Sequence, residues 1–295
     1  MTERLLSGAP PRRLLLATDL SSRSDRALDR AVQLARTWDA ELHLVHAVET
    51  PPPVVPAGVD ERRYLSQYPD LEATAARRLR ALAEHIDLPA RAHVEAGTAA
   101  AAILAVAERE GCDLVVLGEG RSAFSLVEST LERVVRKSPA SVLVVRERPL
   151  GPYCSLLVGT DFTEEARQAL VVAAHLFPQA TIALMHAWVM PYAGLLEDSG
   201  ASEAWAAEHM ARLRAELDAA DLPEPRRQAV RLLVASGVAA VAMRRHVEEH
   251  DIDLTVIGAH PRGLLFDAVV GVSRPILGGI PGDILVVRGV RRSAG

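Results

Sequence analysis

The 295-residue sequence has little cysteine and no long hydrophobic run, and each absence excludes a class of protein. Its two cysteines, Cys112 and Cys154, form no Cys-x-x-Cys motif and cannot build a disulfide framework. We therefore expect a reducing, cytoplasmic environment. No apolar stretch reaches the roughly 18 residues of a membrane span, and none has the form of a secretory signal. We expect no membrane partner.

An excess of charge of one sign is also missing. Residues 1–149 carry 20 basic and 21 acidic side chains, and residues 150–295 carry 13 and 17, which gives the net charge of −5. Neither half has the basic excess that binding to a phosphate backbone requires, so we expect no nucleic-acid partner. The chain does have a 49% apolar content and the length of two ordinary domains.

The sequence repeats itself at an interval of 140–142 residues. Five short blocks of the first half return in the same order in the second half. They begin at Leu14, Leu44, Val94, Asp113 and Val142, and they return at Leu156, Leu184, Val234, Asp253 and Ile284. Constant spacing over five blocks indicates a duplicated domain. Two prolines and one glycine within residues 146–153 mark the joint, so the predicted domains are residues 1–149 and 150–295.

Short apolar runs alternate with segments of helical periodicity in each repeat. The strands expected in the first half are residues 14–18, 42–48, 92–95, 113–117 and 142–145. The expected helices are a segment beginning at a Ser22-x-x-Asp25 capping box, then 71–86, 99–109, 126–136, 164–176, 202–219 and 239–250. This alternation predicts an α/β fold with two doubly wound, five-stranded parallel-sheet domains and helices on both faces of each sheet.

The repeated motifs together resemble one known family. They are Ala-Thr-Asp-x-Ser at 17–21, Leu-His-Leu-Val-His-Ala at 42–47, Asp-Leu-Val-Val-Leu-Gly at 113–118 and Val-Leu-Val-Val at 142–145. The chain resembles a tandem universal stress protein over nearly all of both halves, and this implies a Rossmann-like fold. Dimers of that family pair their last strand across a two-fold axis. We therefore expect Val142–Val145 to pair with Ile284–Val287 and form a monomeric pseudo-dimer, with further dimerisation left open.

A ligand site is expected where the carboxyl ends of the first and fourth strands of each repeat meet. These loops run through Ala17, Asp19, Gly118 and Ser129 in the first repeat, and through Gly159, Asp161, Gly258 and Ser273 in the second. A glycine loop before a helix offers backbone N–H groups to an anion, and a carboxylate suits a ribose hydroxyl. The alternative is that Asp19 and Asp161 only begin a turn and cap the next helix.

In ATP-binding family members a Gly-x-x-Gly segment is followed, nine residues later, by Gly-Ser or Gly-Thr. The second repeat keeps this spacing with Gly258, Pro261 and Gly271, but Pro261 has no N–H to donate and Val272 replaces the hydroxyl residue. Ser273 follows directly. If ATP binds, the resemblance assigns the adenosine end to Gly159, Asp161 and Ala187, and the phosphate side to Ile257, Gly258, Gly271, Val272 and Ser273.

The first repeat departs further from the family pattern. When Ser129 is aligned with the family's serine, the loop from Gly118 is three residues shorter and Glu128 stands where glycine is expected. A carboxylate there repels phosphate, so the first-repeat site of Ala17, Asp19, Gly118 and Ser129 is expected to be degenerate. The sequence implies no cofactor with certainty, and ATP bound in the second repeat is the one cofactor that stays an open alternative.

The resemblance implies a non-catalytic, bacterial stress-response binding protein that acts on an unidentified protein partner. The alternative is an ATP- or AMP-binding sensor that uses the second repeat and hydrolyses ATP slowly. A third hypothesis is a metal or apolar-ligand site at His246 and His250 or around Trp188 and Tyr192, although a solvated helix face and core packing are the favoured explanations of these residues. His46 and His186 are expected to be paired beside the core, and both cysteines to be inert.

Overall fold

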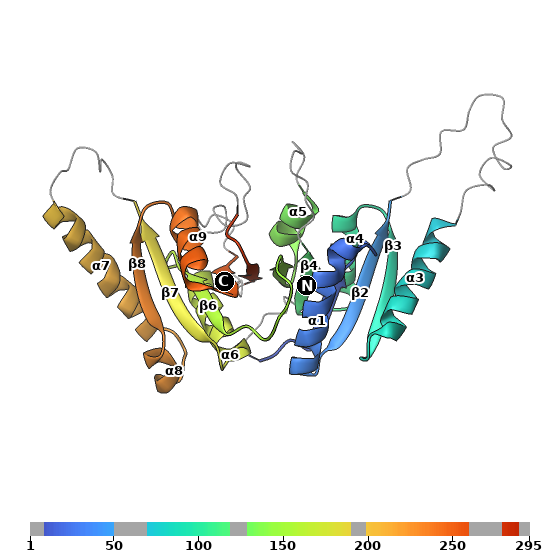
Figure 1. Cartoon of the computed structure of the whole chain (residues 1–295), viewed down its shortest axis with the longest axis horizontal. Coiled ribbons are helices and arrows are strands. Elements are labelled where there is room, and N and C mark those ends of the chain that lie inside the picture. The colour runs from blue at the N-terminus through green and yellow to red at the C-terminus, as the bar shows by residue number, and fades with distance from the viewer. Residues whose placement is uncertain (1–8, 50–69, 119–128, 190–198, 260–278, 289–295) are drawn as a thin grey trace, which may run out of the picture.

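The computed structural model describes residues 9–49, 70–118, 129–189, 199–259 and 279–288. The strands are β1 (Arg13–Ala17), β2 (Glu41–Val48), β3 (Ala90–Ala96), β4 (Leu114–Gly118), β5 (Ser141–Val145), β6 (Ser155–Gly159), β7 (Thr181–Trp188), β8 (Arg231–Ser236), β9 (Leu254–Gly258) and β10 (Asp283–Val287). The helices are the 3₁₀ helix η1 (Ser22–Ser24), α1 (Asp25–Trp38), α3 (Leu71–His85), α4 (Ala99–Arg109), α5 (Thr130–Lys137), α6 (Glu164–Leu176), α7 (Ser199–Asp218), α8 (Glu224–Gln228) and α9 (Ala239–His250). Strands and helices alternate along each half (Figure 1).

All ten strands form one sheet, in the order β3-β2-β1-β4-β5-β10-β9-β6-β7-β8. The pairings within each half are parallel, and β5 pairs with β10 in the antiparallel sense. Leu143 lies opposite Leu285, so the two halves join through their last strands. The predicted α/β fold, its doubly wound repeats and the intramolecular pseudo-dimer are therefore confirmed.

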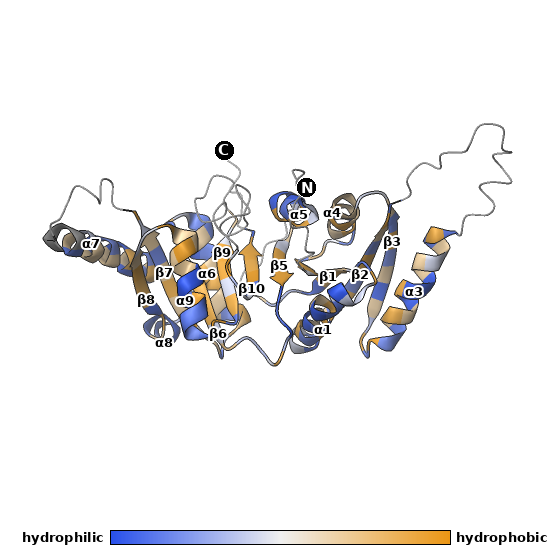
Figure 2. Cartoon of the chain, turned by 45° about the horizontal axis from the view of Figure 1, so that its top comes forward, coloured by the Kyte–Doolittle hydropathy of each residue, from blue (hydrophilic) through white to orange (hydrophobic). Residues whose placement is uncertain are grey.

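Two apolar layers cover the two faces of the sheet. Successive strand residues point to opposite faces, so Leu14 and Leu16 pack toward α1 and α3 while Leu15 between them packs toward α4 and α5. The second half repeats this arrangement, with α6 and α7 on one face and α9 on the other. Figure 2 shows the apolar strands between helices whose outer faces are hydrophilic. Burial on both faces explains the continuous apolar runs in the sequence.

A buried polar cluster joins the two repeats around Asp283. One carboxylate oxygen accepts hydrogen bonds from the backbone N–H groups of Arg146 (2.8 Å) and Glu147 (3.0 Å), beyond the end of β5. The other accepts a 2.5 Å hydrogen bond from the Tyr153 hydroxyl and lies 3.5 Å from Arg30 Nε of α1. Burial, followed by the charge of Asp283, raises the pKa of Tyr153 well above its usual value, so this phenol remains a donor. The cluster thus fixes β10 to α1 of the first half and to the segment that connects the two halves.

Some local predictions were wrong. The expected capping box of Ser22 and Asp25 is replaced by η1, whose N-cap is Ser21. Ser24, which precedes α1, does not cap it with its side chain because its hydroxyl lies 2.8 Å from Thr18 Oγ1. The short helix α8 was not predicted, and α7 begins at Ser199, before the expected start.

Candidate functional site

The carboxyl ends of β1 and β4, and of β6 and β9, lie side by side as the site prediction requires. Ala17 pairs with Leu117, next to Gly118, and Val158, next to Gly159, pairs with Val256. The structure therefore brings the described candidate residues of each repeat to one edge. Three candidates of the second repeat, Gly271, Val272 and Ser273, lie outside the described residues, as do Glu128 and Pro261.

Asp19 is held by the turn that it begins. One of its carboxylate oxygens accepts hydrogen bonds from the Ser21 N–H (2.9 Å), the Ser21 hydroxyl (2.7 Å) and the Ser24 hydroxyl (3.2 Å). Desolvation raises the pKa of Asp19, but these hydrogen bonds outweigh it and the pKa lies below its usual value. Leu20 sits between these residues at φ +58°, a left-handed conformation, and its N–H donates to Thr18 Oγ1.

Asp161 forms the same turn in the second repeat. Its carboxylate accepts hydrogen bonds from the Thr163 N–H (3.3 Å) and hydroxyl (2.6 Å), and Thr163 is the N-cap of α6. Phe162 has φ +64° and donates to Thr160 Oγ1, as Leu20 does in the first repeat. The repeated Thr-Asp-x-Ser/Thr motif is therefore a turn-and-cap device in both halves, which was the alternative reading of the two aspartates.

The candidate glycines allow close packing. A Cβ on Gly258 would lie 2.4 Å from the backbone carbonyl of Glu165, because the beginning of α6 rests on this strand end. A Cβ on Gly159 would lie 2.9 Å from the Met243 terminal methyl of α9. Ile257 is fully buried, whereas Ala187 is half-buried. Gly159, which the family resemblance assigns to the adenosine end of the site, is thus packed against Met243 of α9.

Ser129 is also engaged by the fold. Its hydroxyl accepts the Glu132 N–H at 3.2 Å, and the Glu132 carboxylate accepts the Ser129 N–H at 2.8 Å, which makes a capping box for α5. The sequence signal Ser-x-x-Glu was present and was missed. Ser129 therefore has a structural task that does not depend on a ligand.

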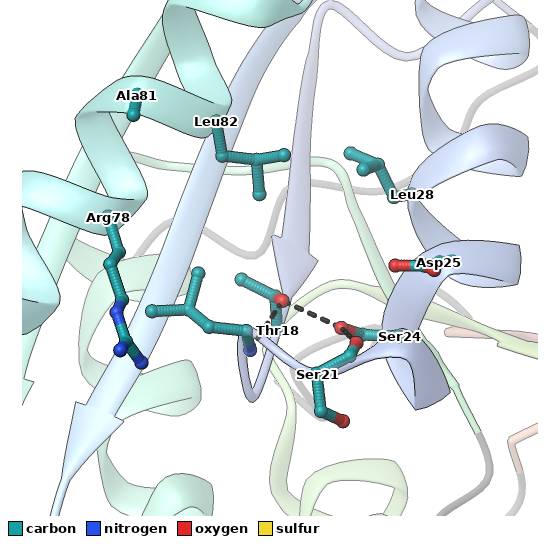
Figure 3. Close-up of a pocket in the computed structure, with 9 residues that line it drawn as sticks. Thr18, Ser21, Ser24, Asp25, Leu28, Arg78, Ala81 and Leu82 are labelled. Atoms are coloured by element: carbon teal, nitrogen blue, oxygen red, sulfur yellow. Dashed lines mark hydrogen bonds between the residues drawn. The ribbon is translucent and has the colours of Figure 1, made fainter.

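A cleft opens on the other side of the Asp19 turn, between α1 and α3. Its volume is about 400 Å³, and a neighbouring hollow of about 280 Å³ extends it toward the end of β2. In Figure 3, Arg78, Ala81 and Leu82 of α3 face Ser24 and Leu28 across the opening. Leu20 and Arg78 line both hollows. The cleft is lined by apolar side chains together with hydroxyls, the Asp25 carboxylate and the Arg78 guanidinium.

The equivalent region of the second repeat carries larger, mutually stacked side chains. Phe162 and His186 have ring centroids 4.2 Å apart, and His186 and His209 are 5.0 Å apart. Trp188 continues the stack to His209 (5.5 Å) and to Trp205 (5.8 Å). Trp188 is only 6% exposed, so it packs in the core, whereas Tyr192, the other residue of the apolar-ligand hypothesis, lies outside the described residues.

The first repeat has smaller residues at most of these positions. To align α3 with α7, we match Leu79 with Leu213, because both side chains are fully buried. On that basis the stack corresponds to Leu20, His46, Ala75, Val48 and Leu71. His46 and His186 themselves are paired beside the core as predicted, since each Nδ1 lies 2.9 Å from the carbonyl oxygen of Thr18 or Thr160. The two halves therefore share a scaffold and differ in what faces the α1–α3 or α6–α7 side.

His246 and His250 lie on α9 with ring centroids 4.1 Å apart. His250 is exposed, and its Nδ1 lies 3.2 Å from the His246 carbonyl oxygen. Within the described residues neither belongs to a group of three potential metal ligands. A solvated helix face accounts for the pair.

The two cysteines differ sharply in accessibility, and this difference is testable. Cys112 is buried, which raises the pKa of its thiol to about 12, whereas Cys154 is exposed. We expect the native protein to show one fast-reacting thiol with an aromatic disulfide reagent, because only a thiolate attacks. The measurement is thiol titration before and after unfolding, with Cys154→Ser as the control that removes the fast phase. Two fast thiols in the native wild type would contradict the buried position of Cys112.

Within the described residues, no helix has the length and apolar character of a membrane span. The fold and the paired strand ends define a tandem protein of Rossmann-like domains. A model of the universal stress protein family matches residues 11–146 and again residues 152–288, and the chain belongs to this family.

Individual relatives agree with this assignment. A universal stress protein of Methanocaldococcus jannaschii is 26% identical over 46% of this chain and 82% of its own length. Universal stress protein A homolog 2 of Coxiella burnetii is 32% identical over 46% of this chain and 94% of its own length, so each relative corresponds to about one repeat. Among solved structures, a universal stress protein from Archaeoglobus fulgidus superposes with a TM-score of 0.67 at 18% identity and covers 96% of this chain and 98% of its own. A Pseudomonas aeruginosa protein described as a putative universal stress protein superposes with a TM-score of 0.60 at 18% identity, over 96% and 95%.

Proposed function

We propose that this chain is a cytoplasmic, non-catalytic stress-response binding protein in which the nucleotide sites at both strand edges are degenerate. One observation carries the proposal: the candidate polar side chains that the structure describes at each edge already have hydrogen-bond partners in the protein. Asp19 and Asp161 hold their own turns, and Ser129 caps α5. Each aspartate is engaged through one carboxylate oxygen, so a ribose hydroxyl would compete with the turn for this group, which offsets part of the binding free energy that a nucleotide gains.

The first-repeat cleft is the surface that we assign to binding. Leu28 and Leu82 supply apolar walls, and Arg78 is exposed at the rim. These groups suit a small amphipathic molecule or an apolar side chain of a protein partner. The second repeat, with its stacked aromatic rings, then serves as a scaffold that covers the last strand of the first.

The second candidate function is an ATP or AMP sensor that uses the second repeat. It is favoured by the spacing of Gly258 and Gly271, followed by Ser273, which keeps the family pattern despite Pro261. Asp161 would be its ribose-binding carboxylate.

Calorimetric titration of ATP into nucleotide-free protein separates the two functions, with AMP titrated in parallel. For degenerate sites we expect no heat up to millimolar ATP and an unchanged thermal midpoint, because a ligand that binds the native state raises it. Binding of about one ATP per chain that is abolished by Asp161→Ala, and kept by the matched variant Asp19→Ala, would overturn the proposal and establish the sensor. Binding lost with Asp19→Ala would instead place the nucleotide in the first repeat and overturn both.

A further inference from the structure

Three potential metal ligands gather in the first repeat, toward the amino edge of the sheet and away from the cleft. His43 of β2 and His93 of β3 lie on neighbouring strands, and Glu110 is the C-cap of α4. One ligand atom from each side chain lies within 4.8 Å of the other two. His43 Nδ1 is 3.0 Å from His93 Nε2, and a Glu110 carboxylate oxygen is 3.9 Å from His93 Nδ1.

His43 has a buried nitrogen that the protein does not satisfy. Its side chain is 1% exposed, and Nε2 has no hydrogen-bond partner among the described residues. The nearest carboxylate oxygen, of Glu41, is 3.6 Å away, which is too far for a hydrogen bond. A histidine that binds a metal through one nitrogen usually donates its other N–H to a carboxylate. His43 points Nδ1 toward His93 and Nε2 toward Glu41, so a small shift of the Glu41 carboxylate would supply this second interaction.

Burial and the neighbouring charges keep the two imidazoles neutral and the Glu110 carboxyl group ionised. Burial lowers the pKa of His43 and of His93, so both imidazoles are uncharged at neutral pH. A hydrogen bond from Arg109 lowers the pKa of Glu110, so its carboxylate is ionised. Metal ions bind neutral imidazole and ionised carboxylate. The other charged groups facing the cluster are Glu41, Glu95, Arg13, Arg91 and Arg109.

We propose that His43, His93 and Glu110 form a binding site for one divalent transition-metal ion, with Zn²⁺ as the ion that this donor set suits best. Two imidazoles and one carboxylate are a common zinc set, with water in the fourth position. Ligand atoms of a tetrahedral zinc ion lie roughly 3.3 Å apart. His43 Nδ1 and His93 Nε2 are 3.0 Å apart, near that value, and the Glu110 carboxylate lies within 4.8 Å of the ligand atoms, so Glu110 has to move toward the two imidazoles to complete the site. Such an ion links β2, β3 and the end of α4.

The second repeat provides an internal comparison. At the constant interval of 140 residues, the three positions are occupied by Ala183, Leu233 and His250. Two of these side chains cannot bind a metal, so the expected stoichiometry is one ion per chain. The pair of half-buried His246 and exposed His250 on α9 is the competing place for an added ion.

The test uses the full chain, stripped of metal by a chelator and titrated with Zn²⁺ by calorimetry. Co²⁺ is then titrated alone, and its visible absorption reports the coordination geometry. We expect one ion per chain in the wild type and at least about a tenfold loss of affinity in His93→Gln and in Glu110→Gln. The matched control, His246→Gln, should bind as the wild type does. Glu110 is partly exposed, so Glu110→Gln keeps the test valid if His93→Gln folds poorly.

Three results would overturn the proposal. They are the absence of a binding signal in the wild type, binding that Glu110→Gln leaves unchanged, and binding that His246→Gln abolishes. Thermal unfolding gives an independent readout: at the same concentration, Zn²⁺ should raise the midpoint of the wild type and of His246→Gln by similar amounts, and should raise that of Glu110→Gln less.

Discussion

Replacing Asp283 by alanine is expected to lower the free energy of unfolding by about 3–5 kcal/mol, the cost of leaving a buried charge without its partner. Arg30 is 5% exposed and Asp283 1%, so water cannot take over the lost interactions. The substitution also removes the acceptor of the Tyr153 hydroxyl and of two backbone N–H groups. Urea denaturation followed by circular dichroism measures the loss. Asp283→Asn, which keeps the shape, should fall between the wild type and Asp283→Ala.

The pseudo-symmetry of the chain supplies a matched control at Ser141. Ser141 is also buried at the start of the last strand of its half, and its hydroxyl accepts the Arg288 N–H at 3.1 Å. Ser141→Ala removes this acceptor and should cost about 1 kcal/mol. Equal losses in Asp283→Ala and Ser141→Ala would show that the charge at Asp283 does not stabilise the junction between the repeats.

The fold was predictable because its signals are local and occur twice. The apolar runs that were predicted as inner strands, such as that beginning at Leu14, lie in a sheet with both faces buried, where a strand needs no alternation. The β5–β10 pairing followed from two apolar edges in one chain. The role of Asp283 at that pairing was not predictable, because Arg30 and Tyr153 reach it from distant parts of the sequence.

The sequence predicted where the candidate site lies, but not which of its residues are already bonded to or packed against other parts of the protein. The positions of Asp19 and Asp161 at the strand ends follow from the topology of the fold. Their hydrogen bonds depend on the left-handed backbone of the next residue, Leu20 or Phe162. Leucine and phenylalanine do not favour that conformation, so the turn could not be predicted from the sequence. The contact of Met243 with Gly159 depends on how α9 packs. The pairing of His43 with His93 likewise depends on the register of β2 and β3, and the sequence of neither strand predicts this register.

The second large effect is expected at Gly258, where the reason for glycine is steric and not conformational. A Cβ there would meet the carbonyl carbon and oxygen of Glu165 at 2.4 Å and the Ala166 nitrogen at 2.7 Å. These are backbone atoms of the first turn of α6, so relief requires the helix to move away from β9. Gly258→Ala should therefore lower the free energy of unfolding by an amount at or above the upper end of the roughly 1–3 kcal/mol typical of overpacking.

Gly118 is the matched control, since it ends β4 as Gly258 ends β9. Its added Cβ would lie 3.4 Å from the Arg23 carbonyl oxygen and 3.7 Å from Ala27 Cβ, which are ordinary contacts. Gly118→Ala should thus be neutral, or stabilising by up to about 1 kcal/mol through the reduced entropy of the unfolded chain. The pair of variants, compared by urea denaturation, isolates the close approach of α6. If Gly258→Ala and Gly118→Ala lower the free energy of unfolding equally, the close approach of α6 does not explain why β4 and β9 end in glycine. If only Gly258→Ala does, its presence in the sequence follows from the fold alone and gives no support to a phosphate loop.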